Sequence, residues 1–146
     1  MVTVIDERDA LLQRGDGLWE RLRNALERHL DEPLAPSTDW TGHDVYGHFA
    51  RWQANTIGEV RELVAGTWRP RDEDEDTLNN RWRDEDRDVP ADVLRERCMS
   101  SRQELRSLLC SLENKQWEVF GRAASADING EHYLHHLRAA GLEPDE

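Results

Sequence analysis

Cysteine is scarce in this 146-residue chain, which contains only Cys98 and Cys110. The two residues form no CxxC pair, and their offset turns them about 120° apart on a helix, so they should not share a face. We therefore interpret both as structural thiols of a reducing compartment rather than as a disulfide or a metal site.

Long hydrophobic runs are also missing. No apolar segment approaches the roughly 20 residues that cross a bilayer. Residues 1–7 lack the basic segment and apolar core of a secretory signal. With 34% charged and 37% apolar residues, the composition predicts a single domain over residues 1–146, located in the cytoplasm and without a membrane partner.

Basic residues are few compared with acidic ones, with 19 Lys and Arg against 31 Asp and Glu and a net charge of −12. Nucleic acids and anionic membranes are bound through basic patches, so neither is an expected partner. A small-molecule substrate or another protein fits this charge better.

Familiar catalytic motifs are absent. The chain has no GxSxG, P-loop, GxGxxG or HExxH pattern. The acidic run at 72–76 is typical of a solvated loop rather than of a catalytic carboxylate pair.

Hydrophobic spacing predicts an all-α fold. Four segments have helical periodicity: residues 6–30 (or 16–30, because Gly15 and Gly17 form a weak point), 41–66, 90–112, and a segment from 127 or 128 to just before Gly141. Residues 68–89 form a long connection with a short helix at 78–83, and residues 121–125 form a loop. Strand alternation is limited to a weak pattern at 117–120. Four helices with one long connection between the second and third predict a four-helix bundle.

The second helix has the clearest start signal. Thr41 and Asp44 match a capping box, with Thr41 as the N-cap. His48 follows Val45 by three residues and precedes Trp52 by four, which places it on the buried side of this helix or at its edge.

Three histidines lie close together near the C-terminus. His132 and His136 are four residues apart, so on a helix both imidazoles project from one face and can bind one metal ion. His135 competes with His136 as the partner of His132, and the spacing favours His136. If the fold brings His48 opposite this pair, the three form an open metal site. The alternative is that these residues are surface or core-edge histidines without a metal, and the pattern alone leaves both interpretations open.

Several segments together resemble the DinB-like superfamily, which includes the metal-binding domain of mycothiol-dependent maleylpyruvate isomerase. Residues 39–50, DWTGHDVYGHFA, resemble the family's "W-T-x-x-D-V-x-x-H-x-A" entry to its second helix. Residues 76–82, DTLNNRW, resemble the Asn-containing segment that follows, and HYLHH is similar to the family's C-terminal HxxxH helix.

The resemblance implies a DinB-like four-helix bundle in which His48, His132 and His136 hold a divalent metal, usually zinc or nickel. It also implies a transferase or isomerase that uses a low-molecular-weight thiol of the mycothiol or bacillithiol type on a small electrophile. The metal would lower the pKa of the thiol. Asn79 or Asn80 would orient the substrate, and a homodimer is expected because dimers are common among similar proteins.

Two further functions stay open at this point. The isomerase has a second, C-terminal domain that this sequence lacks, which argues against maleylpyruvate as the substrate. One alternative is a non-catalytic helical bundle that binds a ligand or a protein partner. The other is a metal-independent DinB-like hydrolase, against which the retention of all three histidines argues.

Overall fold

The computed structural model describes residues 3–139 and 141, and confirms the all-α prediction: within these residues there is no β-strand. The helices are α1 (Val4–Arg28), α2 (Gly42–Ala65), α3 (Glu75–Asp86), α4 (Ala91–Ser111), α5 (Asn114–Gln116), α6 (Arg122–Ala124) and α7 (Glu131–Ala139), with a π-helical turn η1 (Trp117–Gly121) and a 3-10 turn η2 (Ser125–Asp127). None of the described helices combines the length and apolar character needed to cross a membrane.

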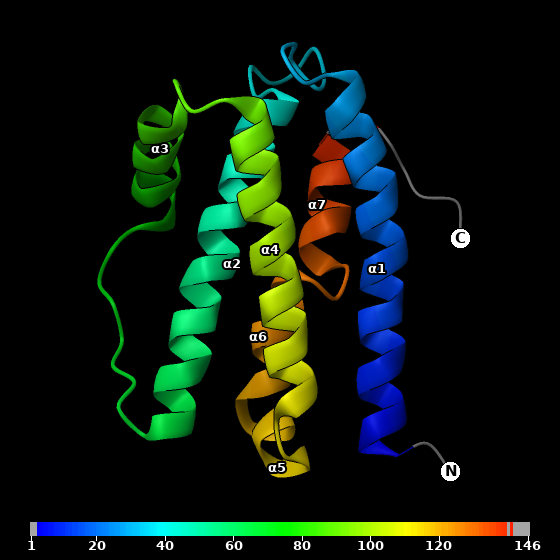
Figure 1. The fold of residues 1–146 in the computed structure, drawn as a ribbon, viewed down its shortest axis with the longest axis vertical. Coiled ribbons are helices and arrows are strands. Elements are labelled where there is room, and N and C mark those ends of the chain that lie inside the picture. The colour runs from blue at the N-terminus through cyan, green and yellow to red at the C-terminus, as the bar shows by residue number, and fades with distance from the viewer. Residues whose placement is uncertain (1–2, 140, 142–146) are drawn as a thin grey trace.

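The three longest helices run alongside one another and form the body of the molecule (Figure 1). Helix α2 packs most extensively on α4 and also contacts α1, while α7 packs on α1. Helix α3 lies outside this group and contacts α2. The pieces from α5 to α7 succeed one another along the long axis, so α7 occupies only the upper half of its column in Figure 1.

Helix α1 is continuous through the weak point expected at Gly15 and Gly17. It starts at Val4 behind a Thr3–Asp6 capping box. Gly15 is buried because the helix passes close to another segment: a Cβ built there would lie 1.7 Å from the carbonyl oxygen of Ile128. Gly15 therefore allows two backbone segments to come into close contact, and it does not mark the start of a helix.

The start and end of α2 agree with the sequence. Thr41 is the N-cap, its hydroxyl accepts from the Asp44 N–H, and the Asp44 carboxylate accepts from the Thr41 N–H, so the predicted capping box is confirmed. The helix ends where Gly66 adopts a left-handed conformation with φ of 75°.

The connection between α2 and α4 contains more helix than predicted. The short helix expected at 78–83 extends over Glu75–Asp86, because Asp74 caps it by accepting from the Thr77 N–H. Part of the acidic run is therefore the start of α3 and not a loop. Helix α4 begins at Ala91, directly after Pro90.

The segment before α7 was predicted wrongly. The loop expected at 121–125 is helical, the weak strand pattern at 117–120 is a π-helical turn, and the last helix starts at Glu131 instead of 127 or 128. Tertiary packing explains the difference, since Trp117 and Gly121 are buried and a buried backbone must pair its polar groups. Gly130, with φ of 113°, separates this segment from α7.

An aromatic cluster joins α1, α2 and α7 in the core. The Trp19 ring lies 6.2 Å from Tyr46, 6.0 Å from Phe49 and 5.4 Å from Tyr133, centroid to centroid. The Tyr133 hydroxyl accepts a hydrogen bond from Nε of buried Arg102 on α4, at 3.0 Å. Tyr133 thus anchors α7 to three helices, because its ring also packs against Phe49 of α2.

The two cysteines lie on different faces of α4, as predicted: Cys98 is buried and Cys110 is exposed. Burial raises the pKa of the Cys98 thiol to about 12. Cys98 therefore serves as a core side chain, packed inside the molecule.

Gly15 and Gly17 form a matched pair for testing the contact between α1 and the backbone at Ile128. Gly15→Ala should destabilise the protein by about 3 kcal/mol or more, because its methyl group overlaps the Ile128 backbone, which cannot move like a side chain. Gly17→Ala should stabilise it by about 0.5–1 kcal/mol, since nothing lies within 4 Å of that position. Urea unfolding of both variants checks the prediction, and equal effects at the two positions would contradict the contact.

Candidate metal centre

Helices α2 and α7 position the three histidines. His48 lies in the second turn of α2, whose register is set by the Thr41 cap. His132 and His136 lie on successive turns of α7, where the Asn129 side chain accepts from the Glu131 N–H at the helix start. The structure therefore brings together residues that are 84 positions apart in sequence.

The Nε2 atoms of these histidines converge on one point. His132 Nε2 lies 3.1 Å from His48 Nε2 and 3.1 Å from His136 Nε2. One ligand atom from each of the three residues falls within a group no wider than 4.8 Å. Nitrogen ligands at about 2.0–2.1 Å from a tetrahedral ion are about 3.3 Å apart, so this spacing fits a small divalent cation.

Hydrogen bonds between the three imidazoles account poorly for this close approach of their nitrogens. A neutral imidazole nitrogen has either one N–H or one lone pair. His132 Nε2 faces two nitrogens at hydrogen-bond distance, and it can donate to only one of them or offer one lone pair to both. A cation at the centre would use all three lone pairs at once, which is the chemical reason to consider a metal here.

An apolar floor lies beneath the three imidazoles. The Phe49 ring lies 4.5 Å from the ring of His132, 5.0 Å from His136 and 5.5 Å from His48. Burial lowers the pKa of His48 to about 3, with the neighbouring imidazoles contributing. Burial likewise lowers the pKa of His136 well below its ordinary value. Both rings are therefore neutral at pH 7, as ligands to a metal must be.

A carboxylate that sequence reasoning missed lies behind His132. Asp127 Oδ1 is 3.4 Å from His132 Nδ1, which makes no hydrogen bond. The other carboxylate oxygen accepts a 2.6 Å hydrogen bond from the Thr56 hydroxyl. Carboxylates commonly orient the imidazoles that bind metals. The only sequence signal for Asp127 was its place shortly before the HxxxH helix.

The histidine centre opens into a cleft of about 570 Å³. Asn79 lines this cleft, and its side-chain oxygen accepts a 2.6 Å hydrogen bond from the Trp52 indole. Asn80 is exposed and is not among the lining residues, so Asn79 is the better placed of the two predicted residues. His135 also lines the cleft, but it is exposed and outside the three-histidine group.

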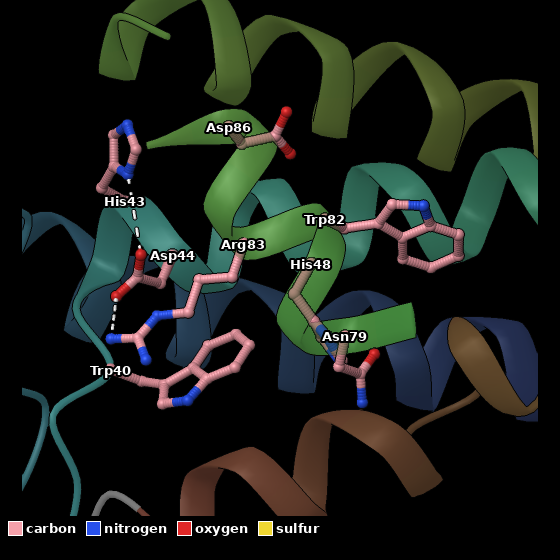
Figure 2. Close-up of a pocket in the computed structure, with 8 residues that line it drawn as sticks. All are labelled: Trp40, His43, Asp44, His48, Asn79, Trp82, Arg83 and Asp86. Atoms are coloured by element: carbon pink, nitrogen blue, oxygen red, sulfur yellow. Dashed lines mark hydrogen bonds and ion pairs between the residues drawn. The ribbon is translucent and has the colours of Figure 1, made fainter. Parts of the chain in front are cut away.

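A second, much smaller pocket lies on the α3 side of His48 (Figure 2). There the Arg83 guanidinium donates to Asp44 at 3.0 Å and lies 4.7 Å from the centre of the Trp40 ring. Trp40 in turn lies 5.7 Å from the His48 ring. Because Asp44 also caps α2, this network ties α3 to the start of the helix that positions His48.

Comparisons with known proteins identify no relative of this chain: no protein-family model, no curated protein and no solved structure matches it. The geometry of the site is therefore the basis for its function.

The pKa shifts predict the behaviour of the metal-free protein at low pH. His48 and His136 should stay neutral at pH 5.5, where an ordinary histidine with a pKa of about 6.5 is mostly charged. Because their folded-state pKa values are lowered, the stability they contribute is complete above pH 6.5. It should fall as the pH decreases, by at most about 1.4 kcal/mol per pH unit for each histidine.

Long-range ¹H–¹⁵N NMR of the imidazole nitrogens measures these protonation states directly. Unfolding experiments at pH 7 and pH 5.5 then measure the loss of stability. Titration of either residue near pH 6.5 in the folded, metal-free protein would contradict the burial argument.

Proposed function

We propose that this chain is a DinB-like metal-binding protein in which His48, His132 and His136 hold one divalent cation. The convergence of three Nε2 atoms on one point is the observation that carries the proposal. Three protein ligands leave a position open for a water molecule or a substrate atom. Imidazole ligands suit zinc or nickel.

The arrangement of the helices supports the DinB-like assignment. Helices α1, α2, α4 and α7 would form the four-helix bundle, with α3 on the long connection between α2 and α4. The resemblance implies histidine ligands on the second and last helices of that bundle, and this proposal is supported by the location of His48 on α2 and of His132 and His136 on α7. Bundle metal sites are built in this way, from side chains on facing helices.

The reaction that fits the site best is transfer or isomerisation of a small electrophile by a low-molecular-weight thiol. A bound metal ion supplies a Lewis acid that lowers the pKa of a coordinated thiol. The protein provides three imidazole ligands, the apolar Phe49 floor that excludes water beneath them, and Asn79 on the cleft wall to orient a substrate. The proposed partner is thus a small molecule.

Metal analysis tests the proposal. Untagged protein should contain about one zinc or nickel ion per chain, or bind one on addition, as three histidine ligands predict. His48→Ala and His136→Ala should each lower metal content by at least about tenfold, because two ligands bind far more weakly than three. Elemental analysis after extensive dialysis measures both.

His135→Ala is the matched control, since it removes a neighbouring histidine on the same helix that lies outside the group. This variant should keep its metal. A wild-type protein that binds no divalent ion would contradict the proposal and leave a non-catalytic bundle as the better description.

Asp127 should strengthen metal binding by orienting His132. Asp127→Asn keeps the size of the side chain and removes the charge beside His132 Nδ1, so zinc affinity should fall about tenfold. Competition against a chromogenic chelator measures the affinity. Asp9→Asn, an exposed change on α1, should have no effect. Unchanged affinity in Asp127→Asn would show that this carboxylate does not support the ligand.

A further inference from the structure

The cleft above the histidines is strongly acidic. Four carboxylates line it: Glu75 and Asp76 from the first turn of α3, Asp127 from η2, and Glu131 from the first turn of α7. Within the part of the chain that the structure describes, no arginine or lysine lines this cleft. The three histidines at its floor are a separate indication that a ligand binds here.

Three of these four carboxylates are available to a ligand, the exception being Asp127, which is engaged by Thr56 and His132. No ion pair among the described residues involves Glu75, Asp76 or Glu131, and all three are exposed. Just outside the cleft the situation differs, since Glu73 pairs with Arg81 at 3.2 Å. The uncompensated negative charge is therefore concentrated on the residues that line the cleft.

Helix ends offset only part of this charge. The N-termini of α3 and α7 each contribute the equivalent of about half a positive charge, so together they balance about one of the four carboxylates. The Trp52 indole lines the same cleft and donates its N–H to Asn79, whereas the Trp40 ring, which also lines the cleft, already packs against the Arg83 guanidinium. Tryptophan is the aromatic residue that attracts cations best.

We infer that the cleft selects a small thiol whose tail is positively charged, such as an amine-bearing thiol, and disfavours thiols with carboxylate tails. This inference rests on the proposed function, in which a metal held by His48, His132 and His136 would bind the thiol end. The tail extends toward the mouth of the cleft, where it meets the carboxylates of α3 and α7.

Three small thiols of similar size test the inference: cysteamine with a cationic tail, 2-mercaptoethanol with a neutral one and 3-mercaptopropionate with an anionic one. Cobalt(II) replaces the metal, and the near-ultraviolet charge-transfer band of a cobalt–thiolate bond reports binding. At low salt and equal thiolate concentration, cysteamine should bind about tenfold more tightly than 3-mercaptopropionate. In about 0.5 M NaCl the preference should shrink, since salt screens exposed charges.

Charge-removing variants show whether the preference between the thiols comes from the cleft carboxylates or from the thiols themselves. The triple variant Glu75→Gln, Asp76→Asn, Glu131→Gln should reduce the ratio of the two affinities to about twofold or less. The control is Asp9→Asn, Glu96→Gln, Glu118→Gln, which changes the net charge equally at exposed positions outside the cleft and should leave the ratio unchanged.

Circular dichroism shows whether the variants fold, and the salt dependence of the wild type tests the inference without them. Equal or tighter binding of 3-mercaptopropionate, or a preference that ignores both salt and the triple variant, would overturn this inference alone. Cobalt binding without any thiol band would overturn the thiol chemistry and the inference with it. Failure to bind cobalt at all would overturn the proposed function itself.

Discussion

The close approach of α1 to the backbone before α7 is the constraint on which the candidate site depends. Gly15 lets α1 touch the Ile128 carbonyl, which no side chain at that position would permit. From there Gly130 leads into α7, and the Arg102–Tyr133 hydrogen bond holds that helix against α4. A shift of α7 by one turn, about 5.4 Å, would separate its histidines from His48.

The site combines two opposite electrical environments within a short distance. On the Phe49 floor, burial disfavours charge and keeps the imidazoles of His48 and His136 neutral. Along the cleft, the unpaired side chains of Glu75 and Glu131 are exposed to solvent. The first environment suits metal ligation, and the second would attract positively charged ligands.

Prediction from the sequence succeeded where structure is local. The Thr41–Asp44 capping box and the Gly66 stop are short-range signals, so the start and end of α2 are predicted correctly. Prediction failed between residues 114 and 130, where Trp117 is buried by distant partners and the backbone becomes helical despite its weak pattern. The predicted α3 is also too short, because the acidic run that contains the N-cap Asp74 has the composition of a solvated loop.

For the site, the sequence by itself determined which histidines share a helix face, because the spacing of His132 and His136 is a property of helix geometry alone. Only the tertiary structure decided that His48 meets them, since helix packing sets the distance between residues 84 positions apart. It also decided the roles of Asp127 and Phe49, whose significance comes from neighbours on other elements. The local spacing of residues does not specify contacts between helices. The sequence therefore indicated the candidate ligands but not that they meet.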